Sequence, residues 1–266
     1  MEMTVNERKV HVDDGSTLEA VRRRFKPEAD VLIVNGFPAE PDRVLRKGDR
    51  ISLIRKGEIP SREELGSLMM ARHTPGVHER LAGERVGIAG VGGLGSHVAV
   101  ALARSGVGSL VIADMDVVEP SNLNRQLYDI TQIGEPKVEA LEKVLKRANP
   151  SVEVKGIRVR LDSCNAPEVF VMCRVVVEAL DDAASKVELI ESLLSSDENR
   201  LVVSGSGLAG FGPADDIRTR RVGRLFICGD MVSDAREGVG LMAPRVMVTA
   251  GHQANQVIRV LLGLDI

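Results

Sequence analysis

One segment of the sequence, "SNLNRQLYDITQIGEPK" at residues 121–137, collects side chains that suit a triphosphate. It holds Asn122, Arg125, Gln126 and Lys137 within a single irregular stretch. Phosphate groups need fixed cations and amide donors along their length, and the arginine fork matches their geometry. A dehydrogenase has no evident use for this set, so the segment indicates chemistry on a nucleoside triphosphate.

A glycine-rich turn precedes this segment. Gly90, Gly92 and Gly95 form the pattern G-x-G-x-x-G in "GVGGLGS", with Gly93 inside it, between a predicted apolar strand and a predicted helix. The first glycine makes the turn, the second lets a phosphate approach the backbone, and the third lets the helix pack against the strand. The helix N-terminus favours the phosphate charge. The turn predicts nucleotide binding, but by itself it fits NAD, FAD and ATP.

Two aspartates follow the next predicted strand. Asp114 and Asp116 lie about 20 residues beyond the turn, where a carboxylate accepts hydrogen bonds from ribose hydroxyls. ATP and NAD both carry a ribose, so Asp114 supports a nucleotide without choosing one, and an ordinary acid at a strand end is the alternative. The cluster at 121–137 favours ATP. A nicotinamide-dependent oxidoreductase is the rival hypothesis.

Strands and helices alternate from Arg85 onward, which predicts an α/β fold with a mainly parallel, doubly wound, Rossmann-like sheet covered on both faces. The predicted strands are 85–90, 109–114, 153–159, 174–180 and 200–204, and the predicted helices are 94–105, 135–147, 165–171 and 183–195. After Gly205 the sequence favours antiparallel strands, and residues 244–263 favour a final amphipathic helix.

The start of the chain has a separate pattern of short strands around one helix. "MEMTVN" and "KVHVDD" predict a hairpin, "STLEAVRRRF" predicts a capped helix, and "DVLIVNG" and "DRISLIRK" predict two further strands. Another short strand is expected between Pro38 and Leu45, and a new helix is expected to begin at Ser61. The predicted organisation is a small domain at 1–58, a linker and arm at 59–84, and a large domain at 85–266.

The composition excludes several classes of protein. The 266 residues are 44% apolar and 27% charged with a net charge of −3, which is typical of a globular chain with a sizeable core. With no Trp, one Tyr and five Phe, the chain lacks aromatic platforms for stacked bases, so we expect no nucleic acid partner. No apolar run could span a membrane and the N-terminus is too polar for a signal peptide, so we expect no membrane partner and a cytoplasmic location.

The motifs together resemble one family. "GVGGLGS", "DMD", "SNLNRQ" and "IGEPK" look like the ThiF/MoeB/HesA family, the adenylating enzymes related to ubiquitin-activating enzymes, and the resemblance covers roughly residues 62–266. It implies an adenylyltransferase that binds ATP and Mg²⁺ in the crevice of a Rossmann-like domain. Such an enzyme adenylates the C-terminal glycine carboxylate of a small β-grasp carrier protein and releases pyrophosphate.

The resemblance also implies roles for individual residues. Asp114 would hold the ribose, Asn122, Arg125 and Gln126 would contact phosphates, and Lys137 would neutralise the α-phosphate region. Asp181, in "VVVEALDDAASK", stands where the family holds magnesium, with Asp182 where the family usually has Asn. Arg125, Lys137 and Asp181 are the expected catalytic residues, because the reaction needs alignment and stabilised charge. The alternatives are a solvated residue opening a helix for Lys137 and a helix N-cap for Asp181.

The N-terminal domain carries a second resemblance. "VNG" at 34–36 and "GDR" at 48–50 look like the sulfur carrier ThiS, a β-grasp protein, which implies a ThiS-like β-grasp domain. A working carrier ends in a free Gly-Gly, whereas "LIRKGEIPSREE" continues without one, so this domain cannot be the group that is adenylated. We expect a separate Gly-Gly-ended, ThiS-like sulfur carrier as partner, in thiamine thiazole biosynthesis. The alternatives are a molybdopterin-type or other carrier, and a non-catalytic regulatory protein that binds a carrier.

The sequence departs from the family pattern at several points. Its three cysteines form no C-x-x-C pair, so we expect no zinc. Family members donate an arginine from an arm, often across a dimer; here "MMARHTPGVHERL" offers Arg72, with Arg80 as the alternative, and a homodimer is implied. Some members pass sulfur through a cysteine. Cys228 is the candidate for that role, although a buried structural cysteine is the simpler interpretation.

Overall fold

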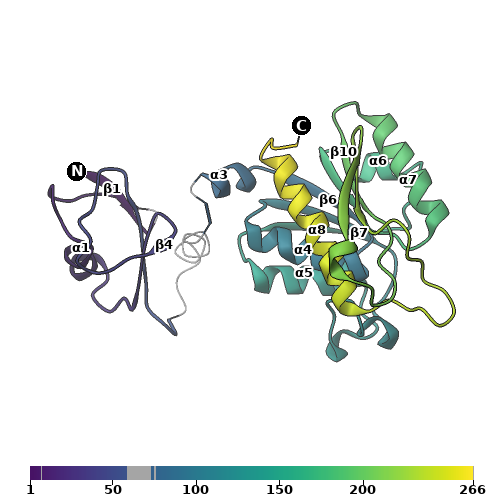
Figure 1. The fold of residues 1–266 in the computed structure, drawn as a ribbon, viewed down its shortest axis with the longest axis horizontal. Coiled ribbons are helices and arrows are strands. Elements are labelled where there is room, and N and C mark those ends of the chain that lie inside the picture. Colours follow the sequence, from purple (N-terminus) through teal and green to yellow (C-terminus); the bar gives the residue numbers. More distant parts are fainter. Residues whose placement is uncertain (7, 59–72, 75, 266) are drawn as a thin grey trace. The chain divides into compact units, whose positions relative to one another are not determined.

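The computed structural model of the chain describes residues 1–6, 8–58, 73–74 and 76–265. It divides into two compact units, Met1–Glu79 and Arg80–Ile266, which are coloured along the sequence in Figure 1. Each unit has its own sheet and its own core. The helix expected from Ser61 and the arm residue Arg72 lie outside the described residues.

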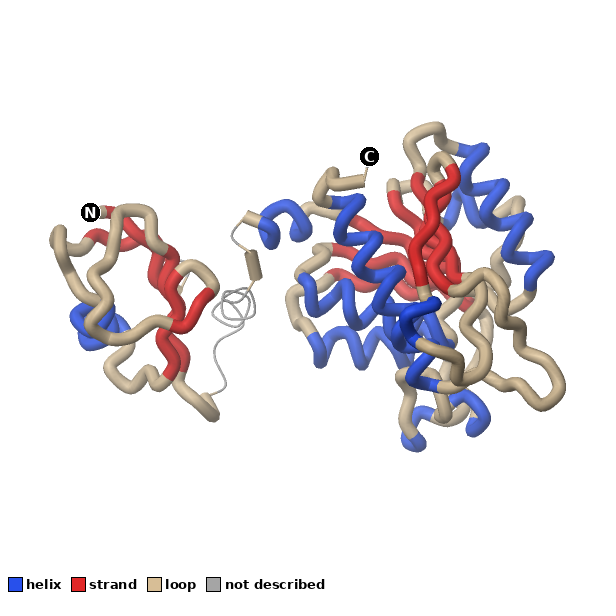
Figure 2. Tube along the Cα trace, viewed as in Figure 1, coloured by secondary structure: helices blue, strands red, loops and turns tan. Residues whose placement is uncertain are grey.

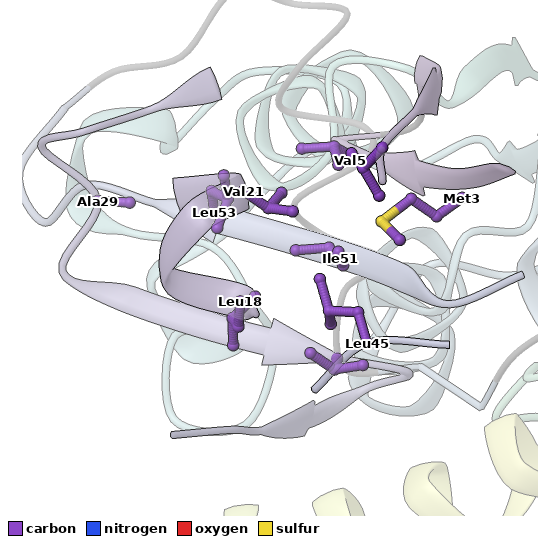
Figure 3. Packing of buried hydrophobic residues seen from close by; sticks show 10 residues of the cluster. Met3, Val5, Leu18, Val21, Ala29, Leu45, Ile51 and Leu53 are labelled. Atoms are coloured by element: carbon purple, nitrogen blue, oxygen red, sulfur yellow. The ribbon is translucent and has the colours of Figure 1, made fainter. Parts of the chain in front are cut away.

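The N-terminal unit is a five-stranded mixed sheet with the order β2-β1-β5-β3-β4. Its elements are β1 (Glu2–Val5), β2 (Arg8–His11), α1 (Leu18–Phe25), β3 (Val31–Val34), β4 (Phe37–Pro38) and β5 (Arg50–Ile54). The side chain of Thr17 caps α1 by accepting a hydrogen bond from the Ala20 amide, as the prediction of a capped helix requires. Leu18 and Val21 of α1 pack against Ile51 and Leu53 of β5 and form the core shown in Figure 3. This arrangement confirms the β-grasp prediction.

The strand expected between Pro38 and Leu45 is largely absent, because β4 covers only Phe37–Pro38. The physical reason is that residues 41–45 use their backbone groups elsewhere. The amides of Leu18 and Glu19 donate to carbonyls of this segment, and the Leu45 amide donates to Ser16. The segment therefore supports the start of α1 instead of extending the sheet.

The C-terminal unit is a seven-stranded sheet with the order β11-β12-β10-β9-β6-β7-β8. Its strands are β6 (Arg85–Ala89), β7 (Ser109–Asp114), β8 (Glu153–Arg158), β9 (Val175–Glu178), β10 (Leu201–Gly205), β11 (Arg218–Val222) and β12 (Leu225–Gly229). Its helices are α4 (Gly93–Ser105), α5 (Lys137–Ala148), α6 (Ala166–Val169), α7 (Ala183–Ser196) and α8 (Ala243–Leu261), and the boundary between the two units falls within α3 (Val77–Ala82). Within this sheet only β11 runs antiparallel to its neighbour, so the doubly wound, mainly parallel prediction is confirmed.

Helices cover both faces of this sheet, as Figures 1 and 2 show: α4, α5 and α8 lie along one face and α6 and α7 along the other. The central strands are buried on both faces, which explains their nearly continuous apolar sequences. The expected helix at 165–171 is shorter than predicted, since α6 ends at Val169. The pair after Gly205 is antiparallel as expected, but β12 itself runs parallel to β10.

The strand order places a switch point between β6 and β9. From β6 the chain proceeds to β7 and β8 on one side, and it later returns to build β9 and β10 on the other side. In open sheets of this kind the loops diverge at such a point and leave a crevice outside the carboxyl ends of the strands, where ligands bind. The fold therefore fixes where a nucleotide site belongs.

Candidate functional site

A cavity of about 650 Å³ lies at this switch point. Its lining includes most of the site residues predicted from the sequence, namely Gly90, Gly92, Gly93, Asp114, Asp116, Arg125, Gln126, Lys137 and Asp181. Gly95 and Asn122 are not among its lining residues. The fold thus brings the glycine turn, the strand-end aspartates and the 121–137 segment to one place.

The glycine turn is built in a way that only glycine permits. Gly90 adopts a φ of +86°, in the left-handed region. A Cβ on Gly95 would lie 1.9 Å from the Gly90 carbonyl oxygen, so this glycine allows α4 to pack closely against the end of β6. Gly92 precedes α4 and offers no side-chain cap, which leaves the first-turn amides available to a phosphate.

Asp114 joins the glycine turn to the end of β7. Its Oδ2 accepts a hydrogen bond from the Val91 amide at 2.8 Å, and its Oδ1 accepts one from the Asp116 amide at 2.9 Å. These bonds fix the carboxylate at the cavity wall, and each oxygen keeps a further lone pair for a hydroxyl donor. The position is suitable for the ribose contact that we predicted.

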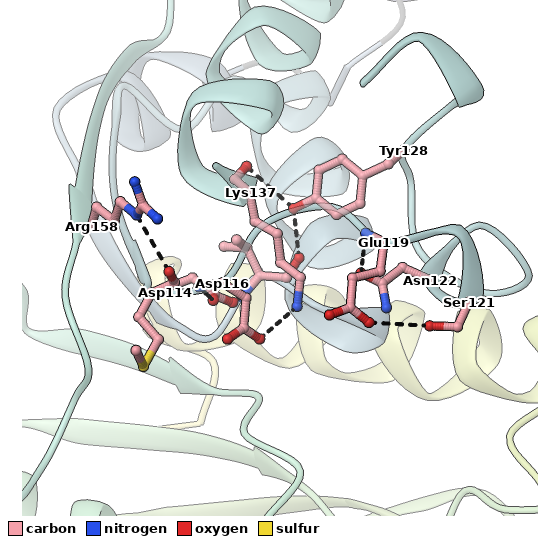
Figure 4. A network of polar contacts seen from close by, with 10 residues as sticks. Asp114, Asp116, Glu119, Ser121, Asn122, Tyr128, Lys137 and Arg158 are labelled. Atoms are coloured by element: carbon pink, nitrogen blue, oxygen red, sulfur yellow. Dashed lines mark hydrogen bonds and ion pairs between the residues drawn. The ribbon is translucent and has the colours of Figure 1, made fainter. Parts of the chain in front are cut away.

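Lys137 is the first residue of α5, and its side chain is only 8% exposed. Its Nζ lies 2.8 Å from Oδ2 of Asp116, which is itself 60% exposed (Figure 4). Tyr128 supports the same residue, because its hydroxyl donates to the Val91 carbonyl at 2.8 Å and approaches the Lys137 carbonyl at 3.3 Å. Burial, and then the nearby Asp114 charge, raise the pKa of Tyr128, so the hydroxyl stays protonated as a donor.

Arg125 and Gln126 provide the next polar groups in the lining. Arg125 is half-buried, and its Nη1 donates to the Ser121 carbonyl at 3.1 Å and to Oδ1 of Asn124 at 2.9 Å. Gln126 is buried, and its Oε1 has no hydrogen-bond partner among the residues that the structure describes. A buried amide oxygen without a partner is costly, and a donor from a bound ligand would satisfy it.

Asn122 has a local structural task. It ends the short 3₁₀ turn Pro120–Asn122, where its Oδ1 accepts from the Glu119 amide at 3.0 Å and the Glu119 side chain accepts from the Asn122 amide in return. This capping box, visible in Figure 4, orders the segment that leads to Arg125. The predicted phosphate contact of Asn122 stays a prediction.

Asp181 and Asp182 follow β9 and have different environments. Asp182 is the N-cap of α7, and its carboxylate accepts from the Ser185 amide at 2.7 Å. The hydrogen bonds from Ser185 lower the pKa of Asp182. Asp181 is exposed and lines the cavity, so the N-cap alternative that we considered for Asp181 belongs to its neighbour. Asp181 thus remains available to a cation.

A buried polar cluster near Asp181 was missed by sequence reasoning. Glu178, at the end of β9, is fully buried and pairs with Nζ of Lys186 at 2.6 Å and with the Ser204 hydroxyl at 2.6 Å. Burial raises the pKa of Glu178, whereas the Lys186 charge and the hydrogen bonds act against that shift. Lys186 also lines the cavity, as do the cationic side chains of Arg125, Lys137 and Arg160. The available signal was an acidic residue at the end of an otherwise apolar strand, "VVVE".

The remaining candidates lie away from this cluster. Cys228, in β12, is fully buried, and burial raises the pKa of its thiol to about 11, so the thiol is protonated at neutral pH. Arg80, the alternative arm residue, donates to the Leu262 carbonyl at 2.7 Å. Across the described ranges, no group of three His, Cys, Asp or Glu side chains could hold a metal ion alone. None of the described helices is long and apolar enough to cross a membrane.

A mainly parallel sheet with a glycine turn, a fixed strand-end aspartate and a buried lysine at its switch point defines an α/β protein of the Rossmann-like class. The chain belongs to the ThiF family, which it matches over residues 66–266. Residues 1–57 match the ThiS-like ubiquitin family. Both matches confirm the two resemblances that the motifs indicated.

Individual relatives agree with this membership. Adenylyltransferase and sulfurtransferase UBA4 of Eremothecium gossypii is 33% identical over 223 residues, covering 78% of this chain and 49% of the relative. SAMP-activating enzyme E1 of Haloferax volcanii is 42% identical over 104 residues, covering 39% of this chain and 38% of the relative. The chain spans about half the length of the UBA4 relatives it matches.

Solved structures share the fold of the larger unit. The E. coli tRNA N6-threonylcarbamoyladenosine dehydratase TcdA, in complex with ATP, superposes with a TM-score of 0.67 at 18% identity. The match covers 73% of this chain and 92% of TcdA. At this identity the likeness shows a common fold and leaves the reaction to be argued from the site.

Proposed function

We propose that this protein is an ATP-dependent adenylyltransferase that activates the C-terminal glycine carboxylate of a small sulfur carrier protein. The observation that carries the proposal is the convergence of the glycine turn, Arg125, Lys137 and Asp181 on one cavity at the switch point of the sheet. The ThiF family membership and the UBA4 and SAMP-activating relatives, which act by adenylylation or activation according to their names, support it.

The chemistry needs no nucleophile from the protein. The carrier carboxylate attacks the α-phosphorus of ATP, a carboxylate oxygen–phosphorus bond forms, and the bond from the α-phosphorus to the bridging oxygen breaks, so that pyrophosphate leaves. The enzyme must align these groups and stabilise negative charge as it spreads over the phosphates. In this proposal the α4 N-terminus and Gly92 receive the phosphates, Asp114 orients the ribose, and Arg125 and Lys137 supply fixed positive charge.

The residues also fit a magnesium ion held jointly with ATP. Mg²⁺ commonly binds through one or two carboxylates plus substrate phosphates, and Asp181 is an exposed carboxylate in the cavity lining. Bound there, Mg²⁺ would supply further neutralisation of the phosphate charge. Oε1 of Gln126 is buried and has no partner in the described part of the chain, so it is a second position that a donor on a bound group would satisfy.

The partner we propose is a separate ThiS-like carrier that ends in Gly-Gly, in thiamine thiazole biosynthesis. The fused ThiS-like domain supports a link to that class of carrier, and because its sequence continues past Lys56 without Gly-Gly, it is not itself the substrate. A molybdopterin-type or other sulfur carrier is the alternative within the same reaction. We further propose a homodimer in which Arg72 of the arm completes the phosphate site.

The decisive experiment is ATP–pyrophosphate exchange with Mg²⁺, run with and without candidate carriers from the same cell. Exchange that requires a carrier, and disappears when the carrier loses its final glycine, is the expected result and identifies the partner. Binding of ATP without exchange for any carrier would replace the proposal with a regulatory, carrier-binding role.

A further inference from the structure

The cavity extends beyond the residues assigned to the nucleotide. It is also lined by two loop segments, 205–209 and 231–235, which follow β10 and β12 and contain no lysine or arginine. We call these two segments the loop wall. Small residues predominate in the first of them, where Gly205, Ser206, Gly207 and Ala209 leave room for another backbone. The triphosphate chemistry does not account for this part of the lining.

One arginine binds both segments that flank the loop wall. Arg245, in the first turn of α8, has a side chain that is only 5% exposed. Its Nη1 donates to the carbonyls of Gly212 at 2.6 Å and Pro213 at 2.9 Å, just after the first segment. Its Nη2 donates to Oδ2 of Asp230 at 2.5 Å, just before the second segment. A buried guanidinium with three such partners holds the two segments in one fixed arrangement.

Asp230 transmits this constraint into the loop wall. Its Oδ1 accepts from the amides of Val232 and Ser233, each at 2.8 Å. The Ser233 hydroxyl then accepts from the Ala209 amide at 3.1 Å, which connects the second segment to the first. The chain of contacts therefore runs from Arg245 through Asp230 and Ser233 to Ala209, in the first segment of the loop wall.

The backbone of the loop wall is adapted to this network. Met231 adopts a φ of +65°, which is uncommon for a residue with a side chain. Gly207 has a φ of +77°, and a Cβ there would lie 2.0 Å from Oδ1 of Asp230. Glycine at this position lets the carboxylate lie directly against the first segment. Strained backbone of this kind persists only where its surroundings determine it, and it concentrates at functional sites.

Two strongly exposed apolar side chains lie in or near the loop wall. Phe211, beside Gly212, is 90% exposed, and Val232, two residues after Asp230, is 86% exposed. Val232 also belongs to the cavity lining, whereas Phe211 does not. Exposed apolar groups at a cavity rim suit a protein partner, whose end enters the cavity while its body stays outside.

We propose that Arg245 and Asp230 are positioning residues that hold the loop wall in the shape that receives the carboxyl-terminal segment of the carrier protein. This inference rests on the proposed function, because it assigns the carrier to the loop wall. The pair touches neither ATP nor the reacting carboxylate. Its effect is to place the carrier's end against the α-phosphorus, and geometric misplacement of a reacting group lowers rates steeply.

The test compares steady-state exchange kinetics of Arg245→Met and Asp230→Asn with those of the wild-type chain. In both variants KM for the carrier should rise about tenfold while KM for ATP stays within about twofold, because only carrier placement is lost. Arg245→Lys, which keeps the charge, should recover part of the loss. Ser233→Ala is a milder variant in case these alter folding, with an expected rise in carrier KM of about threefold.

Arg259→Met is the matched control, because Arg259 also lies on α8. Its Nε donates to Oδ2 of Asp265 at 2.6 Å, and neither residue belongs to the cavity lining. It should leave both KM values unchanged. Amide hydrogen exchange of the loop wall gives a readout independent of turnover: it should accelerate in Arg245→Met and remain slow in Arg259→Met.

The outcomes separate this inference from the proposed function. Carrier-dependent exchange in the wild type, with unchanged carrier KM in Arg245→Met and Ser233→Ala, overturns the inference alone. A parallel loss of ATP and carrier affinity also overturns it, since that pattern indicates general damage. Absence of exchange in the wild type with any carrier removes the proposed function and, with it, the assignment of the carrier to the loop wall.

Discussion

The ammonium of Lys137 lies 2.8 Å from the carboxylate of Asp116, with the lysine nearly buried and the aspartate mostly exposed. The side chain is therefore extended toward the cavity and held there before any nucleotide arrives. This preorganisation is what a charge-stabilising residue requires, because little reorganisation is then needed during reaction. Lys137 opens α5 but is not solvated, and its role at the phosphates stays a prediction.

Removal of the cavity charges should abolish most of the adenylation. Lys137→Ala and Asp181→Ala should each lower carrier-dependent ATP–pyrophosphate exchange by about a hundredfold, since each deletes an interaction that is strongest in the transition state. Lys143→Ala serves as the control, because Lys143 lies on the same helix but is exposed and pairs with Glu135. Near-normal exchange in either cavity variant would remove that residue from the assigned site.

The ion pair between Asp116 and Lys137 predicts an effect on the free energy of unfolding that depends on ATP. Asp116→Asn should lower the free energy of unfolding by about 1 kcal/mol without nucleotide, because the pair is partly exposed. This loss in the free energy of unfolding should be smaller with saturating ATP, since the phosphates replace the lost negative charge beside Lys137. Unfolding can be followed through Tyr128, the only Tyr in a chain without Trp, which reports on the unit Arg80–Ile266.

The matched control for this prediction is Glu135→Gln, which breaks the exposed pair with Lys143 at 2.9 Å. Its effect on stability should not depend on ATP. If the deficit of Asp116→Asn is also independent of ATP, then the Lys137 ammonium does not engage the nucleotide and its assigned role is wrong.

The sequence predicted those features that depend on short-range patterns. Nearly continuous apolar strands and the glycine turn sufficed for the parallel sheet, because β6 and β9 must be buried on both faces. Residues such as Asp114 were identifiable because their place after a strand is set by the chain itself. The strand that was predicted after Pro38 but is largely absent shows the limit. The backbone of that segment pairs with residues at the start of α1, and no local sequence pattern indicates this pairing.

Contacts between distant segments could not be predicted. Glu178 meets Ser204 across neighbouring strands, and Arg245 meets Asp230 only because α8 crosses the end of β12. Nothing in the sequence distinguishes Tyr128 from an ordinary aromatic residue, yet its hydroxyl contacts carbonyls of both the glycine turn and α5. In each case the functional property arises from three-dimensional placement, since a single sequence carries no information on pairs that meet through tertiary packing.

Tyr128→Phe tests the connection between the glycine turn and Lys137. Loss of the hydroxyl leaves the Val91 carbonyl without a donor in a buried position, which should cost about 1–2 kcal/mol of stability. KM for ATP should also rise, because the turn and the start of α5 lose their shared donor. Calorimetric unfolding and exchange kinetics measure the two effects. A stability loss with unaltered KM for ATP would show that the hydroxyl only stabilises the fold.

The Asp230 network makes stability depend on pH at the acidic end. Burial acts to raise the pKa of Asp230, but hydrogen bonds from Ser233, Val232 and Arg245 outweigh it and lower the pKa to about 2. In the unfolded chain an aspartate has a pKa of about 3.9, so the ionised network stabilises the fold above about pH 4. That contribution should be lost progressively as the pH falls from about 4 to about 2.

Denaturant unfolding across this pH range, followed through Tyr128, measures the effect. Asp230→Asn should show a flatter decline than the wild type, because the variant has no carboxylate to protonate at this position. In Arg245→Met the decline should be smaller and should end at a higher pH, since one of the interactions that lower the pKa of Asp230 in the folded state is gone. Identical pH profiles for wild type and Asp230→Asn would show that the carboxylate is not held by the network, and the loop wall would then need another explanation for its fixed shape.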